Sequence, residues 1–236
     1  MTTPSGPLRF ELLSLFPEFF RGPLGESILK RAIERGLIEV GFVDIRDFAE
    51  NKHNKVDDRP YGGGPGMVLM PGPVTKAIRS VRRPGSRVVY LTPQGTPLTA
   101  LRAAELAREP HLVLLCGHYE GVDQRALDLE IDEELSIGDY VLTNGCLAAL
   151  VVLDAVARFV PGVLGDEESA AQDSFQDGLL DCPHYTRPEE FEGCRVPEVL
   201  LSGHHQRIAE WRHEASLTKT RRVRPDLLPP CEQPMR

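Results

Sequence analysis

Three glycine-containing loops could together hold a flat ligand. They are residues 91–95 (LTPQG), 117–121 (GHYEG) and 137–145 (IGDYVLTNG), and each follows a short apolar segment. Glycine lets a backbone approach a ligand closely and adopts positive φ values without strain. In an open α/β sheet, loops at the carboxyl ends of neighbouring strands converge on a crevice where ligands bind. Each loop alone is typical of a turn, but the three together predict a pocket for a nucleoside-like ligand held by backbone groups.

Residues 57–67 (DDRPYGGGPGM) form a further unusual segment, with four glycines and two prolines between Pro60 and Met67. A glycine-rich loop of fixed shape is costly in conformational entropy. Such loops usually serve a ligand or a subunit partner, so we expect one of these roles here. A flexible surface loop is the alternative interpretation.

Two charged side chains could act on a proton of a substrate. Arg158 follows a long apolar segment, and Asp173 lies in a polar one. A carboxylate can accept a proton, and a guanidinium can stabilise the anion that remains. From their spacing alone, an ordinary ion pair or two solvated charges is the simpler interpretation.

A scaffold must position these groups, and residues 1–160 alternate strand-like and helix-like segments. We expect strands at residues 8–16, 37–48, 87–91, 111–116 and 135–137, with a turn at residues 92–95. We expect helices at residues 24–35, 74–83, 97–108 and 147–160. Apolar strands that alternate with helices are typical of an α/β fold with a mostly parallel sheet.

The composition is that of an ordinary globular protein, with 41% hydrophobic and 26% charged residues. The amino terminus lacks a basic region followed by an apolar core, so we expect no signal peptide. The longest apolar run, Cys146–Leu153, is far shorter than the roughly 20 residues that span a bilayer. Five cysteines without a CxxC pair fit reduced thiols. We therefore expect a cytoplasmic protein with no membrane segment.

The character of the chain changes after Pro161. Residues 162–183 are rich in Gly, Asp, Glu, Ser and Gln, which indicates a linker. Residues 203–224 hold six basic residues against two acidic ones, although the whole chain has a net charge of −8. We interpret this end as a small helical domain with a basic face. The alternative is a solvated helix with scattered charge.

Seven motifs along the chain give it a family resemblance. They are DDRPYGGGPGM, YLTPQG, CGHYEGVDQR, EIDEELSIGDYVLT, RFVPGVLG, DSFQDGLLDCPHYTRP and VPEVLLSGHH. In this order, from about Leu8 to Leu228, the sequence resembles the bacterial tRNA (guanine-N1)-methyltransferases. No single motif would carry this resemblance, whereas seven in the family's order make it specific.

The resemblance implies an α/β methyltransferase domain of the SPOUT class, with a deep trefoil knot and a mostly parallel sheet, over residues 1–162. Residues 163–184 would be an interdomain linker that carries the catalytic aspartate, and residues 185–236 a small helical domain that binds the anticodon arm of tRNA. The implied reaction transfers a methyl group from S-adenosylmethionine to N1 of the guanine next to the anticodon. The enzyme would be a homodimer whose active sites are shared between subunits.

The resemblance also assigns roles to individual residues. Asp173 matches the family's proposed general base, and Arg158 matches the arginine that stabilises the activated guanine. The residues that match the cofactor pocket are Tyr90, Leu91, Pro93, Gly117, Tyr119, Glu120, Ile137, Gly138, Tyr140, Leu142 and Gly145. Magnesium dependence is implied as well, but the sequence shows no metal-ligand pattern. The alternatives are a SPOUT-class methyltransferase for another RNA nucleotide and a non-catalytic RNA-binding protein.

The sequence departs from the family at one place. Where the family commonly has Gly-Gly-Glu-Leu-Pro-Ala, this chain has Asn144, Gly145, Cys146, Leu147, Ala148 and Ala149. Asn tolerates positive φ better than other non-glycine residues, so we expect Asn144 to keep the turn. The loss of a carboxylate at Cys146 and of a proline at Ala148 leaves the rigidity of this loop open.

Overall fold

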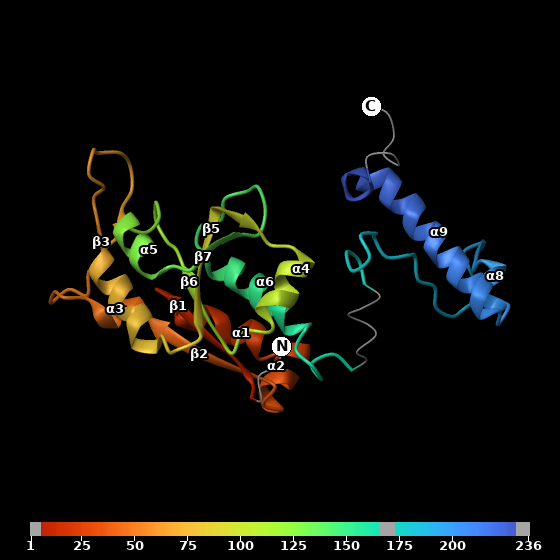
Figure 1. The fold of residues 1–236 in the computed structure, drawn as a ribbon, viewed down its shortest axis with the longest axis horizontal. Coiled ribbons are helices and arrows are strands. Elements are labelled where there is room, and N and C mark those ends of the chain that lie inside the picture. The colour runs from red at the N-terminus through yellow and green to blue at the C-terminus, as the bar shows by residue number, and fades with distance from the viewer. Residues whose placement is uncertain (1–5, 166–172, 230–236) are drawn as a thin grey trace. The chain divides into compact units, whose positions relative to one another are not determined.

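The computed structural model describes residues 6–165 and 173–229 (Figure 1). The chain divides into two compact units, residues 1–167 and 168–236. Within the described residues, no helix is both long and apolar enough to cross a membrane. Each unit is described by itself.

Within residues 6–165, a five-stranded parallel sheet has the strand order β2-β1-β6-β5-β7. Its strands are β1 (Leu8–Ser14), β2 (Ile38–Asp44), β5 (Ser86–Pro97), β6 (His111–Cys116) and β7 (Glu133–Ser136). Every residue of β6 is buried, which requires a continuous apolar run such as HLVLLC. The predicted α/β fold with a mostly parallel sheet is confirmed.

Helices cover both faces of this sheet. One face is covered by α1 (Arg21–Leu24), α2 (Ser27–Glu34), α4 (Ala100–Leu106) and α6 (Cys146–Ala157). The other face is covered by α3 (Pro71–Val81) and α5 (Gln124–Glu130). The shorter elements of the unit are the 3-10 helices η1 (Pro17–Phe20) and η2 (Ile45–Phe48) and the paired strands β3 (Asp57–Asp58) and β4 (Val68–Leu69).

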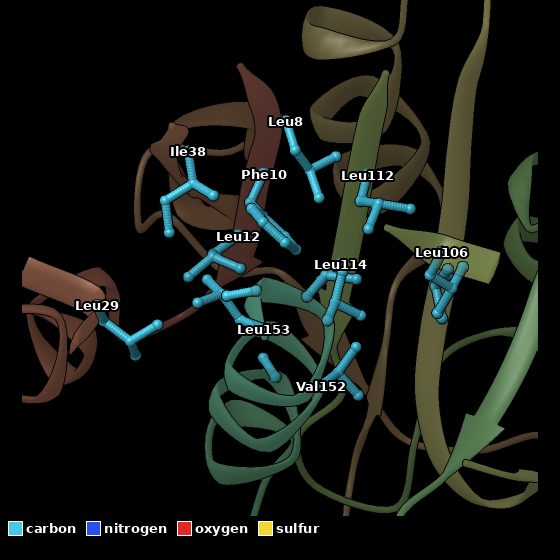
Figure 2. Close-up of a cluster of buried hydrophobic side chains, with 14 of the residues drawn as sticks. Leu8, Phe10, Leu12, Leu29, Ile38, Leu106, Leu112, Leu114, Val152 and Leu153 are labelled. Atoms are coloured by element: carbon cyan, nitrogen blue, oxygen red, sulfur yellow. The ribbon is translucent and has the colours of Figure 1, made fainter. Parts of the chain in front are cut away.

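The buried side chains of the strands point alternately to the two faces of the sheet and so form two core clusters. Leu12 and Leu114 belong to the cluster beneath α6, and Figure 2 shows Val152 and Leu153 of that helix beside them. Leu115, the next residue of β6, belongs to the cluster on the opposite face. Successive side chains of a strand point to opposite faces, so each cluster takes every second apolar residue.

The expected turn at residues 92–95 was wrong. These residues lie within β5, which continues to Pro97 with a register shift between Leu91 and Thr96. The second part of the strand stays paired because Thr96 and Pro97 align with Leu135 and Ser136 of β7. Proline and glycine therefore mark an irregularity in this strand, where we expected its end.

The predicted strand at residues 37–48 ends at Asp44, because η2 begins at Ile45. The side chain of Asp44 accepts a hydrogen bond from the backbone N–H of Arg46, which caps this short helix. Helix α5 was missed by the sequence reasoning. It has only seven residues and, unlike the predicted helix at residues 97–108, no proline at its start to mark it.

The second unit contains the long helix α9 (His205–Val223), which occupies most of the basic segment at residues 203–224. Its other elements are the paired strands β8 (Glu190–Phe191) and β9 (Cys194–Arg195), the helix α8 (Glu198–Leu201) and the 3-10 helix η3 (Pro225–Leu227). The arginines of α9 and its carboxyl end are exposed. The expected positive charge therefore faces solvent.

Truncation of the core on β6 should destabilise the first unit. Leu114 is fully buried, and Leu114→Ala should lower the free energy of unfolding by about 2–5 kcal/mol. Leu129→Ala is the control, because Leu129 is 66% exposed and its loss should cost less than about 0.5 kcal/mol. Urea unfolding should be followed by far-UV circular dichroism, because the single tryptophan lies in the second unit. Equal destabilisation by the two variants would contradict this view of the core.

Candidate active site

A cavity of about 270 Å³ lies where the three glycine-containing loops meet. Two of these loops follow β6 and β7, and the third is the irregular middle part of β5 after Leu91. All three lie at one edge of the sheet because Leu91 of β5 pairs with the last residue of β6 and with Leu135 of β7 in parallel strands. Every residue matched to the cofactor pocket lines this cavity: Tyr90, Leu91, Pro93, Gly117, Tyr119, Glu120, Ile137, Gly138, Tyr140, Leu142 and Gly145. The structure thus brings these residues together, while their role in binding stays a prediction.

Gly145 joins two of the loops by a close backbone contact. Its N–H donates a hydrogen bond to the carbonyl of Gly117 at 2.9 Å. A Cβ atom on Gly145 would lie 2.8 Å from the Cα of Cys116 and 2.9 Å from the amide nitrogen of Gly117. Any larger residue would push the loops apart, so the shape of the cavity depends on this glycine.

The loop after β6 contains a residue in a strained backbone conformation. Tyr119 has φ of +59°, a region that residues other than glycine seldom adopt. Its ring contacts the ring of His118 at 4.4 Å, and His118 in turn contacts Phe16 at 5.2 Å. Strain of this kind is often found at functional sites, where the surrounding contacts hold it in place.

His118 is a lining residue that the sequence reasoning did not select. Its Nδ1 atom is buried and has no hydrogen-bond partner within the described residues. The only sequence signal was its place between two selected residues, Gly117 and Tyr119.

The glycine-rich segment at residues 57–67 lies against the same loop. The N–H of Glu120 donates to the carbonyl of Met67 at 2.9 Å, and the N–H of Leu69 donates to the carbonyl of Gly121 at 2.9 Å. A Cβ atom on Gly66, which has φ of +77°, would collide with the side chain of Glu120. The segment therefore packs against a loop that lines the cavity, and its function stays a prediction.

Asn144 keeps its turn by a mechanism that differs from the expected one. It does not adopt positive φ. Its side-chain oxygen accepts a hydrogen bond from the N–H of Cys146 at 2.9 Å, next to the first turn of α6. The N-cap residue of α6 is Gly145, so the Asn144 side chain orders the chain ahead of the helix by a local turn to the N–H two residues on.

The thiols of Cys116 and Cys146 lie behind the cavity and are buried. A hydrogen bond from Cys116, together with one from Ser14, lowers the pKa of Cys146 to about 7. The hydrogen bond to Cys146 and burial raise the pKa of Cys116 well above its usual value. Cys146 thus fills, as a buried packing residue, the place where the family commonly has a carboxylate. Cys231 lies outside the described residues.

Arg158 and Asp173 belong to different units. Arg158 is the C-cap residue of α6 in the first unit. Asp173 belongs to the second unit, and its carboxylate accepts a hydrogen bond from the N–H of Ser174 at 2.8 Å. That the two act on one substrate stays a prediction.

The second unit has a cavity of its own, of about 410 Å³. Arg187 and Arg212 line it beside Tyr185. Both arginines are exposed, and neither forms an ion pair within the described part of the chain. Two guanidinium groups at one hollow suit an anionic ligand such as a phosphate.

Among residues 6–165 and 173–229, one cluster has the composition of a metal site. It consists of Asp181, Cys182 and His184, whose potential ligand atoms lie within 4.8 Å of one another. The imidazole Nε2 of His184 already pairs with the carboxylate of Asp181 at 2.6 Å. Magnesium prefers oxygen ligands, so a thiol and an imidazole do not fit the magnesium that the resemblance implied.

Comparison with known proteins agrees with the resemblance seen in the sequence motifs. The family model described as tRNA (Guanine-1)-methyltransferase TrmD matches residues 8–230. A tRNA (guanine-N(1)-)-methyltransferase of Protochlamydia amoebophila is 66% identical over 218 residues, which are 92% of this chain and 98% of that protein. Proteins of the same name from Chlamydia muridarum and Chlamydia pneumoniae are each 59% identical over 93% of this chain. The chain spans 62% and 61% of their respective lengths.

Substitution of Gly145 should weaken cofactor binding. Gly145→Ala should lower the affinity for S-adenosylmethionine by about tenfold, because the new Cβ must displace the backbone at Cys116 and Gly117. Gly22→Ala is the control, since a Cβ there meets nothing within 4 Å. Isothermal titration calorimetry measures both affinities. Wild-type affinity in the Gly145 variant would show that this contact does not shape the binding site.

Proposed function

This chain belongs to the tRNA (guanine-1)-methyltransferase family, and on that premise we propose that it methylates N1 of the guanine next to the anticodon of tRNA. The methyl donor is S-adenosylmethionine. The observation that carries the proposal is the cavity formed by the middle part of β5 and the loops after β6 and β7. All residues matched to the family's cofactor pocket line this cavity. The family match over residues 8–230 includes the segments that would hold both substrates.

The chemistry of the cavity fits an adenosine-containing cofactor. Gly117 and Gly145 bring backbone close to the cavity, while Leu91, Ile137 and Leu142 offer apolar surface for a flat ring. Small-molecule pockets typically combine apolar walls with a few backbone donors and acceptors in this way. When bound, S-adenosylmethionine supplies an electrophilic methyl group on a sulfonium.

Asp173 and Arg158 would activate the guanine. Its N1 carries a proton and is a poor nucleophile until that proton leaves. The carboxylate of Asp173 would accept the proton, which leaves an electron pair on N1, and the guanidinium of Arg158 would stabilise the negative charge that develops on O6. Much of the rate would come from the alignment of the two substrates.

A homodimer would bring the two units of different copies together. Phe16 and Phe19, at 45% and 42% exposed, line a largely apolar hollow of about 530 Å³ beside His118. Leu147 and Val151, 48% and 46% exposed, are one turn apart on α6, against which η1 packs. An apolar area of this kind is typical of a protein interface. We assign it to a second copy of the chain, within a dimer whose active sites are shared.

The second unit would hold the tRNA. The exposed basic residues of α9, together with Arg187 and Arg212 at the second cavity, would contact phosphates of the anticodon arm. Such contacts position an RNA without reading its sequence. The target base must be unstacked to reach the first cavity, which loop nucleotides allow.

The remaining assignments rest on the family relationship. They are a trefoil-knotted methyltransferase domain at residues 1–162, a linker at residues 163–184, a helical tRNA-binding domain at residues 185–236 and a cytoplasmic location. Magnesium has no assigned ligands, and no step of the proposed reaction depends on it.

The function is tested with radiolabelled S-adenosylmethionine and tRNA transcripts that have guanine or adenine next to the anticodon. Only the guanine transcript should be labelled. Asp173→Asn should reduce the rate by about 10²–10⁴-fold and leave cofactor affinity unchanged. Asp177→Asn is the matched control, because Asp177 is exposed in the same segment and should stay within a few-fold of wild type. Equal labelling of both transcripts, or parallel loss of cofactor affinity in Asp173→Asn, would count against the assignment.

A charge on the exposed face of α6 should separate the subunits. The wild-type chain should sediment as a dimer, and Val151→Glu should sediment as an inactive monomer, because a buried unpaired carboxylate is costly. Leu129→Glu, on an exposed position of α5, should stay dimeric and active. Analytical ultracentrifugation at the assay concentration measures this. A fully active monomer would overturn the shared site.

A further inference from the structure

The segment that begins at Asp173 is a closed turn. The N–H of Phe175 donates to the carbonyl of Leu179 at 2.8 Å, and the N–H of Asp181 donates to the hydroxyl of Ser174 at 3.0 Å. Asp173 is joined to the first residue of this turn and accepts the N–H of Ser174. Whatever fixes the turn therefore limits where the carboxylate of Asp173 can lie.

Thr220 of α9 anchors this turn. Its side chain is fully buried, and its Oγ1 accepts a hydrogen bond from the N–H of Leu180 at 2.9 Å. The same hydroxyl donates its proton to the carbonyl of Ser216, one helical turn earlier, at 2.7 Å. Because a hydroxyl has one proton, this bond leaves a lone pair for Leu180 and fixes its direction.

Arg224 makes a second contact from the same end of α9. Its guanidinium lies over the ring of Phe175 at 5.8 Å, and the carboxylate of Asp226 orients it through hydrogen bonds of 2.7 and 2.9 Å. Phe175 has φ of +76°, which a residue other than glycine keeps only when its surroundings hold it. The turn is thus held at Leu180 and at Phe175, both times by α9 or its C-cap residue.

We propose that Thr220 is a positioning residue for the methyl transfer, which acts by fixing the turn that carries Asp173. The inference rests on the proposed function, since it takes Asp173 as the proton acceptor. It also predicts different effects for Arg224 and the nearby Arg222. Both are exposed cations at the end of the helix that would hold tRNA, but Arg224 contacts the turn and should affect the rate as well as tRNA binding.

The test compares Thr220→Val, which keeps the shape and removes the hydroxyl, with Thr220→Ser, which keeps the hydroxyl. Thr220→Val should lower kcat at saturating tRNA and cofactor by about 10- to 100-fold, because a misplaced reacting group costs rate. The dissociation constants for tRNA and S-adenosylmethionine should change less than about twofold, because the groups that bind them are untouched. Thr220→Ser should restore kcat. Thr218→Val, at an exposed position of α9, is the control and should behave as wild type.

A second variant keeps the test decisive if Thr220→Val folds poorly. Ser174→Ala removes one of the two bonds that close the turn and leaves α9 intact, and it should also lower kcat. The double variant should be no slower than the slower single variant, because both changes loosen one turn.

Three results would overturn the inference. Wild-type kcat in both Thr220→Val and Ser174→Ala, with Asp173→Asn inactive, would refute the positioning role alone. Failure of Thr220→Ser to restore kcat, with loss of tRNA affinity, would assign Thr220 to folding of the second unit. Wild-type kcat in Asp173→Asn would remove the proton acceptor, and both the proposed mechanism and the positioning role would fall.

Discussion

The burial of β6 on both faces is the constraint on which the first unit depends. A strand with no exposed residue needs helices on each side of the sheet, and the crossover connections that supply them keep neighbouring strands parallel. Parallel strands end at one edge, so the loops after β6 and β7 meet there with the irregular middle part of β5. The close contact of Gly145 with Gly117 then sets the distance between two of these loops. The cavity is a consequence of the core beneath it.

The second unit follows a different principle, because few of its side chains are buried. Its order depends on α9, where the fully buried hydroxyl of Thr220 holds the turn that starts at Asp173. The same helix carries the exposed positive charge expected to face tRNA. A cation-rich helix that also fixes the proton acceptor would link recognition of the RNA to chemistry on its base. Under the proposed mechanism, this link would explain why one unit binds the tRNA and carries the proton acceptor.

The sequence predicted the features that depend on long patterns. The apolar run of β6 and the apolar helix α6 were found, since both need continuous burial. Features set by single contacts were not found. The strand β5 continues through residues 92–95 because β7 pairs with its far part. Asn144 holds its turn by a side-chain hydrogen bond from Cys146, where we expected positive φ. Thr220 gave no signal in the sequence, because its role depends on a partner forty residues away. Family resemblance singled out Asp173 and Arg158 as candidates, which spacing alone could not, and their catalytic roles stay predictions.

The central claim is that Arg158 of one copy acts with Asp173 of another, and mixed dimers test it most directly. Arg158→Ala and Asp173→Asn chains are each expected to be inactive. Unfolded together and refolded as a mixture, they should recover roughly a quarter of wild-type activity, because half of the dimers are mixed and each has one intact site. An active mixture of two inactive chains would support a shared site. A mixture that stays inactive, although mixed dimers are present, would contradict it and place both residues in the site of a single chain.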